Sequence, residues 1–206
     1  QENGRVNKVA VMALKARTLT YAASPLFNTE NDQSLWQRAA IANKDVIDIS
    51  IANGYKLVNY TDLWGPNNWQ SDEAIFVRRI TESNGSNILE SRNFPVGVEG
   101  GNSGNTPSQT LVDAYQMKDT GKFWNEEGSG FDPNNPYVGR DPRFNMTIVK
   151  NGDTGWPSYN TNPIQTYFNG TNGEPLSGAT PTGYYLKKML DSTIDLRPGR
   201  ETRSRH

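Results

Sequence analysis

The first fifty residues carry a helical pattern of small and apolar side chains. Between residues 4 and 28 such side chains recur at three- and four-residue spacing. This period predicts an α-helix that a second helix can approach closely. Ser24 precedes Pro25, and a residue before proline disfavours the helical region, so we expect the helix to end there.

A second helical pattern follows from about Ser34 to Asn53, with Ser34 expected to cap its start and Gly54 its end. Its stripe comprises Leu35, Trp36, Ala39, Ala40, Val46 and Ile47, and we expect Trp36 to pack in the core. Two such helices predict an antiparallel hairpin, which cannot bury both of its faces alone. We therefore expect the apolar side chains of one group to be covered by another chain or unusually exposed: Val9, Leu14, Val46 and Ile47.

The remainder of the chain is rich in turn-forming residues and predicts short elements within loops. Residues 73–80 have strand composition, Ser108 is placed to cap a short helix over 110–117, and 145–149 predicts a strand. Asn151-Gly152 is a tight-turn pair, and residues 184–190 favour a strand or a helical turn. In the segment RDPRF, Asp141 precedes proline and Arg140 or Arg143 can pair with a carboxylate, which indicates a structural corner.

Composition narrows the function classes. The hydrophobic fraction is 34%, and the chain has 19 glycines and 12 prolines. The formal net charge of -1 argues against a nucleic-acid binder. The sequence holds no cysteine, no apolar run of membrane-spanning length and no signal peptide. If the protein is exported, we expect this chain to be mature, trimmed or part of something larger.

Most catalytic and metal-binding arrangements are missing from the sequence. The single histidine, His206, is terminal, which argues against a serine–histidine–aspartate triad and histidine metal sites. Neither a P-loop nor a dinucleotide loop occurs, so we predict no cofactor, and no metal site built from histidine or cysteine. A glycoside hydrolase needs only two carboxylates, and the weak candidates are Asp62, Asp72, Glu73, Asp132 and Asp141.

Aromatic residues in turn-rich, amide-rich surroundings are the chemistry that the sequence does supply: Trp64, Trp69, Trp124, Trp156, Tyr159 and Tyr167. An aromatic ring covers the C–H face of a sugar, while amide, carboxyl and guanidinium groups satisfy its hydroxyls. A loop tryptophan can equally plug its own loop onto the core. As a group, these aromatics favour a sugar-binding surface without singling out its residues.

Five motifs, taken in order, resemble one family closely. The segments are GRVNKVAVMALKARTLTYAASPLFN, LWQRAAIANKDVIDISIANGYKL, PSQTLVDAYQM, YVGRDPRFNMTIVKNG and TGYYLKKM. In this order they resemble the SusD-like (RagB) family of outer-membrane nutrient-binding lipoproteins, from Gly4 to about Leu190.

The resemblance implies a mainly α fold, in which tetratricopeptide-like helix pairs carry a large irregular loop-rich region with a few short strands. We expect residues 1–206 to be one SusD-like domain fragment, with a hairpin scaffold over 1–54 and a ligand-binding region over 55–206. The resemblance also implies a non-enzymatic protein, lipid-anchored at the surface of a Bacteroidetes-type outer membrane. Its implied partners are an oligosaccharide from polysaccharide utilisation and a SusC-like TonB-dependent transporter.

The family is typically more than twice this length, so we expect the missing remainder of the chain to be a further partner. The family's ligand site has no fixed motif, and the site prediction rests on the aromatic argument. The predicted ligand-binding residues are Trp124, Trp156, Asn125, Tyr159, Asn160, Trp64 and Trp69. Two alternatives stay open: a helical-repeat scaffold that binds peptide or protein, and a carboxylate-based glycoside hydrolase.

Overall fold

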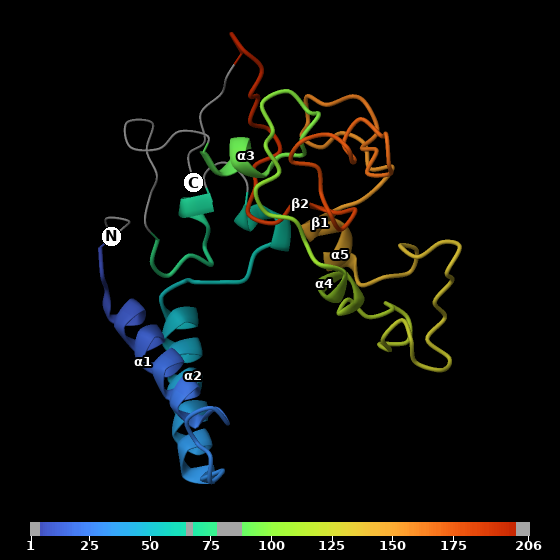
Figure 1. Cartoon of the computed structure of the whole chain (residues 1–206). Helices are drawn as coiled ribbons and strands as arrows, with labels where there is room; N and C mark the ends of the chain where they lie inside the picture. The colour runs from blue at the N-terminus through green and yellow to red at the C-terminus, as the bar shows by residue number, and fades with distance from the viewer. Residues whose placement is uncertain (1–4, 65–67, 78–87, 201–206) are drawn as a thin grey trace. The chain divides into compact units, whose positions relative to one another are not determined.

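The computed structural model describes residues 5–64, 68–77 and 88–200, which divide into two compact units (Figure 1). Of these residues, the first unit holds 5–63 and 68–77, and the second holds 64 and 88–200. The fold is mainly α with few short strands, as predicted. Each unit is described below by itself.

Two long helices, α1 (Lys8–Ala23) and α2 (Gln33–Ala52), form the hairpin of the first unit (Figure 1). The end of α1 at Ser24 before Pro25 confirms the sequence prediction. The predicted cap of α2 is wrong: Asp32, whose carboxylate accepts a hydrogen bond from Ser34 N at 2.8 Å, caps this helix. An aspartate placed two residues earlier offers the helix start a charged acceptor. Gly54, with a φ of +83°, follows the last turn as expected.

The contact between α1 and α2 is a narrow seam of small residues. The buried side chains are Val9, Ala16 and Ala23 on α1, and Ala39 and Ala42 on α2. On α2 these alanines continue through half-buried Leu35, Val46 and Ile49, at alternating four- and three-residue spacing. Asn43 Nδ2 donates to Thr20 Oγ1 across the seam at 3.0 Å.

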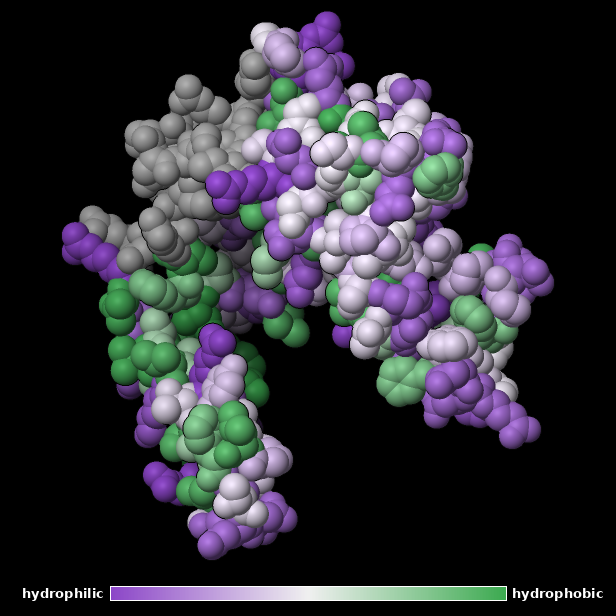
Figure 2. Space-filling view, viewed as in Figure 1, coloured by the Kyte–Doolittle hydropathy of each residue, from purple (hydrophilic) through white to green (hydrophobic). Residues whose placement is uncertain are grey.

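Residues one position away from this seam turn by about 100° and leave it. Trp36 is 38% exposed, so its predicted core packing is wrong. The predicted exposure of unpartnered apolar side chains is confirmed for Leu14, at 67%, and for Ile47. It is wrong for Val9, which is buried in the seam, and for Val46, which is half-buried there. Figure 2 shows hydrophobic side chains gathered over the hairpin; the exposed ones include Val11, Leu14, Tyr21, Ile41, Ile47 and Ile51.

The rest of the first unit is loop with two short 3-10 helices, η1 (Tyr60–Leu63) and η2 (Asn68–Gln70). The strand predicted over 73–80 is wrong for its described part, because 73–77 form turns and bends. Glu73 instead accepts a hydrogen bond from Val58 N through its side chain, and Ala74 N donates to Ser71 O. Residues 78–80 lie outside the described part of the chain.

The second unit is built around one two-stranded sheet. Strands β1 (Ile148–Val149) and β2 (Tyr185–Leu186) pair antiparallel, with Ile148 opposite Leu186 and Val149 opposite Tyr185. Successive strand residues point to opposite faces. Val149 and Tyr185 therefore enter a first core cluster with Phe94, Val98, Trp156, Ile164 and Leu190. Ile148 enters a second cluster with Val112, Phe144 and Tyr184.

Three short helices lie around this sheet: α3 (Ile88–Asn93), α4 (Gln109–Asp113) and α5 (Pro142–Thr147). Ser108 caps α4 as predicted, accepting from Leu111 N at 3.2 Å, although the helix is shorter than 110–117. The strand predicted over 145–149 is wrong in its first three residues. They belong to α5, because Asp141 caps that helix and Pro142 is compatible with its first turn.

Residues 117–140 form a closed excursion between α4 and α5. Met117 and Arg140 form a β-bridge at its base, and Lys118 N donates to Gly139 O at 2.8 Å. The buried Arg140 guanidinium, 6% exposed, makes four hydrogen bonds, to the carbonyls of Val112, Tyr115 and Pro136. It has no carboxylate partner among the described residues.

We predict that Arg140→Met lowers the free energy of unfolding by about 3 kcal/mol, because several buried carbonyls lose a charged donor. Arg140→Lys keeps the charge but not the planar fork, so it recovers only part of the loss. Arg143→Met is the control, since Arg143 is exposed and pairs with Asp141 outside the core. Chemical denaturation followed by tryptophan fluorescence measures these differences. Equal losses for Arg140→Met and Arg143→Met would contradict a stabilising role of the Arg140 hydrogen bonds.

The cap of α5 gives a second prediction. Asp141 accepts a hydrogen bond from Arg143 N at 2.9 Å, and its pKa is lowered mainly by the Arg143 side chain. Asp141→Ala is expected to cost about 1 kcal/mol of unfolding free energy, whereas Asp141→Asn retains the capping oxygen and costs less.

The pKa shift also sets the sign of a pH effect on this cap. Because folding lowers the pKa, the advantage of aspartate over asparagine is fully present above its ordinary value of 3.8. It disappears as the pH falls through the lowered pKa. Denaturation of the protein and of Asp141→Asn between pH 2 and pH 7 measures this, and a difference independent of pH would refute it.

Candidate functional site

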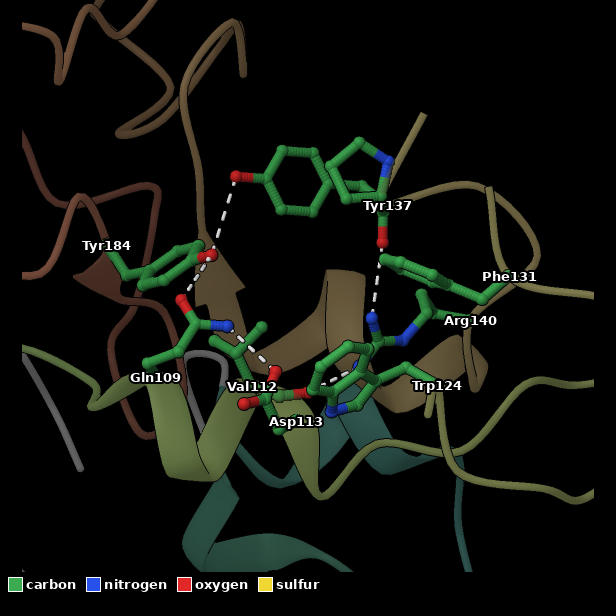
Figure 3. A pocket seen from close by; sticks show the side chains of 9 residues that line it. Gln109, Val112, Asp113, Trp124, Phe131, Tyr137, Arg140 and Tyr184 are labelled. Atoms are coloured by element: carbon green, nitrogen blue, oxygen red, sulfur yellow. Dashed lines mark hydrogen bonds between the residues drawn. The ribbon is translucent and has the colours of Figure 1, made fainter. Parts of the chain in front are cut away.

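A cavity of about 230 Å³ lies between α4, the excursion 117–140 and the segment leading into β2 (Figure 3). All of its lining residues belong to the second unit. They are Gln109, Val112, Asp113, Trp124, Phe131, Pro136, Tyr137, Arg140 and Tyr184.

One side of the cavity is aromatic. Trp124, 39% exposed, meets Phe131 edge to face, with ring centroids 5.7 Å apart. The Phe131 ring lies 5.8 Å from the Arg140 guanidinium carbon. Ser129 fixes the turn between them by donating to Trp124 O at 3.2 Å. These contacts hold Trp124 with part of its ring open to solvent.

The other side is a chain of hydrogen bonds, which we call the polar rail: Tyr137, Tyr184, Gln109 and Asp113 (Figure 3). Tyr137 OH donates to Tyr184 OH at 3.5 Å, and Tyr184 OH donates to Gln109 Oε1 at 3.1 Å. Gln109 Nε2 then donates to Asp113 Oδ1 at 2.8 Å. Gln109 and Asp113 stand four residues apart on α4 and therefore share one face of that helix.

Tyr184 is a member of the rail whose pKa is shifted by its surroundings. Burial raises the pKa of Tyr184 well above its usual value. Tyr184 therefore stays a neutral donor at any physiological pH. The rail ends on the Asp113 carboxylate, whose Oδ2 accepts no hydrogen bond from a described residue.

The structure brings only one predicted ligand-binding residue, Trp124, into this cavity. Asn125 is exposed next to it in the excursion and does not line the cavity. Three others come together elsewhere in the second unit. Trp156 is 7% exposed in the first core cluster, where it meets Phe94 edge to face, with Lys187 Nζ 5.3 Å from its ring.

Tyr159 and Asn160 adjoin Trp156 on the same cluster. Tyr159 packs against Phe94 and donates from its hydroxyl to Glu99 O at 2.6 Å, and burial raises its pKa to about 12. Asn160 Nδ2 donates to Trp156 O at 3.3 Å. These hydrogen bonds join the segment 156–160 to itself and to the loop at residue 99.

The two second-choice tryptophans belong to different units. Trp64 lies in the second unit, with Lys188 Nζ 5.7 Å from its ring. Trp69 lies within η2 of the first unit. Neither lines the cavity.

Sequence reasoning did not select the residues of the polar rail as ligand-binding. The signal that marks two of them is the pair Gln109 and Asp113 at i and i+4 of a helix whose cap at Ser108 is recognisable. Tyr137 and Tyr184 are separated from that pair and from each other by long stretches of chain, so only the fold unites them. The sequence predicts Arg140 as part of a structural corner, and its guanidinium donates to Val112 O in the structure.

The described residues were compared with the requirements of a metal site and of a membrane-spanning helix. Over 5–64, 68–77 and 88–200, no group of three or more histidine, cysteine, aspartate or glutamate side chains could hold a metal ion. The same part of the chain contains no helix that is both long enough and apolar enough to cross a bilayer.

Comparison with known proteins places this architecture. The SusD family model matches residues 72–205. The solved structure of a SusD-like protein from Bacteroides fragilis superposes with a TM-score of 0.68 at 22% sequence identity. The match covers 99% of this chain and 40% of that one, so the chain spans well under half the length of this solved relative. A search of curated proteins returns no match. Since the family model covers well over half of the sequence, the chain belongs to the SusD family.

Proposed function

We propose that this chain binds an oligosaccharide at the cavity between α4 and the excursion 117–140. The observation that carries the proposal is Trp124, a half-exposed ring held opposite the polar rail in one cavity. A sugar ring presents an apolar C–H face and a rim of hydroxyls. The aromatic side of the cavity suits the C–H face, and the polar rail suits the hydroxyls. The volume of about 230 Å³ lies below the roughly 300–1,000 Å³ of pockets for drug-sized ligands, and suits one ring of a longer glycan.

The wider role is proposed from membership of the SusD family. In this proposal the protein is lipid-anchored at the cell surface, binds its glycan without cleaving it, and delivers it to a SusC-like TonB-dependent transporter in the outer membrane. The exposed apolar side chains of the hairpin, among them Leu14 and Ile47, then pack against further sequence of the same protein.

The carboxylates of the second unit support binding rather than hydrolysis. Among the cavity's lining residues Asp113 is the one carboxylate, and glycosidases need two. Two of the carboxylates weighed as catalytic candidates have local structural partners instead. Asp141 caps α5, and Asp132 accepts hydrogen bonds from Asn134 N and Asn135 Nδ2.

A specific observation favours a second candidate function, the binding of a peptide or protein segment. Apolar side chains on both helices of the hairpin are exposed, including Leu14, Ile47 and Ile51. Such a face suits an amphipathic segment. In that case changes on the hairpin, rather than at Trp124, would abolish ligand binding.

The test is calorimetry of the purified protein against a panel of oligosaccharides and short peptides. For a glycan that binds, Trp124→Ala is expected to weaken affinity by about fivefold, because a stacking platform contributes on the order of 1 kcal/mol. Phe123→Ala is the matched control, since this neighbouring exposed ring does not line the cavity. Binding of peptides alone, or glycan binding indifferent to Trp124, would overturn the proposal.

The remaining ligand-binding residues predicted from the sequence stay predictions, and the same experiment tests them. They are Asn125, Trp156, Tyr159, Asn160, Trp64 and Trp69. Because Trp156 is buried, its variant must be Trp156→Phe, with thermal unfolding measured alongside. A loss of glycan affinity at unchanged stability would place Trp156 at the ligand; unchanged affinity would leave it a core residue.

A further inference from the structure

The cavity holds one cation and one anion, and they differ in what they have left to offer a ligand. Arg140 is buried and already donates four hydrogen bonds to backbone carbonyls. Its guanidinium carbon also lies 5.8 Å from the ring centroids of both Phe131 and Phe144. A guanidinium binds a carboxylate or sulfate most strongly through two parallel N–H groups, and here that fork is occupied.

Asp113 is in the opposite condition. It is half-buried, its Oδ1 accepts from Gln109 Nε2, and its Oδ2 has no donor among the described residues. A partly desolvated carboxylate oxygen gains most from an O–H or N–H donor, and repels a second anion strongly.

The direction of the polar rail adds to this bias. The Tyr137 and Tyr184 hydroxyl protons are committed along the rail toward Gln109, and one Gln109 N–H is committed to Asp113. The polar rail therefore leaves open two acceptors, Asp113 Oδ2 and the Tyr137 hydroxyl oxygen, against one donor, the second Nε2–H of Gln109. It asks for a ligand that brings hydrogen-bond donors.

From these observations, and resting on the proposed glycan-binding function, we propose that the cavity selects a hydroxyl-bearing sugar ring without acidic groups. Asp113 is the residue that excludes uronic and sulfated sugars. A neutral ring stacks on Trp124 and donates hydroxyl hydrogen bonds to Asp113 Oδ2. An acidic ring in the same place meets the Asp113 charge, while the fork of Arg140 remains occupied by carbonyls.

The experiment uses matched pairs of oligosaccharides with the purified protein. Gluco-, galacto- and manno-configured oligosaccharides are each compared with the uronic-acid oligosaccharide of the same configuration and length. For the configuration that binds, the acidic member is expected to bind at least about tenfold more weakly, because like charges in contact are strongly unfavourable.

Asp113→Asn separates charge from shape. Its side-chain oxygen can still accept from Gln109, so thermal unfolding is expected to stay unchanged. Affinity for the neutral glycan falls by about tenfold as a charge-assisted hydrogen bond is lost, and the gap between the neutral and acidic members closes to about threefold. Asp119→Asn is the control: this exposed carboxylate in the excursion does not line the cavity, and both affinities stay unchanged.

The outcomes distinguish the two proposals. Acidic glycans that bind as tightly as neutral ones, with Trp124→Ala still weakening both, would overturn the role of Asp113 and leave glycan binding standing. A preference for neutral glycans that survives Asp113→Asn would also overturn it. If no oligosaccharide binds, or if Trp124→Ala changes nothing, the proposed function fails and this inference fails with it.

Discussion

The second unit depends on the burial of one positive charge. Placing a guanidinium in the interior is costly unless every donor finds an acceptor. Arg140 meets most of this requirement, with four hydrogen bonds to carbonyls from three places: the end of α4, the residues after it and the return of the excursion. These bonds fix the excursion against the helix. They join α4, which carries Asp113, to the excursion, which carries Trp124.

The short sheet sets where the cavity can open. Within β1, Ile148 enters the second cluster and Val149 the first, because neighbouring strand residues face opposite ways. Tyr184 belongs to the second cluster and also lines the cavity, and Tyr137 packs against that cluster by stacking on Phe144. Tyrosine suits this boundary, since its ring is apolar and its hydroxyl needs a polar partner. Two members of the polar rail, Tyr137 and Tyr184, are therefore anchored in the second core cluster.

The hairpin of the first unit buries small residues and leaves larger apolar residues exposed. Alanines along the seam allow α1 and α2 to approach closely, but small side chains bury little apolar area. The larger apolar residues, Leu14, Ile47 and Ile51 among them, face away from the seam. A helix pair of this kind gains stability from neighbours rather than from its own contact, as helix pairs do in repeat proteins.

Local signals in the sequence determined several ends of the elements and the family. The Ser108 cap, the proline after Ser24, the glycine after α2 and the Asn151-Gly152 turn act over a few residues and can be recognised in the sequence. The same locality explains two errors. Strand composition over 73–77 could not reveal that Glu73 would bond the loop at Val58, and a helical stripe could not say which of its edges would form the seam that leaves Trp36 exposed.

The site is where tertiary structure decided most. Trp124 could be nominated from its surroundings, but nothing in them distinguishes it from Trp156, which the fold places in the core. The cavity is lined by residues from 109–113, from 124–140 and by Tyr184. The polar rail exists only once the sheet and the hydrogen bonds of Arg140 bring these segments together. Periodicity and capping report the conformation of neighbours in the chain, whereas burial and hydrogen-bond partners depend on packing between segments far apart in it.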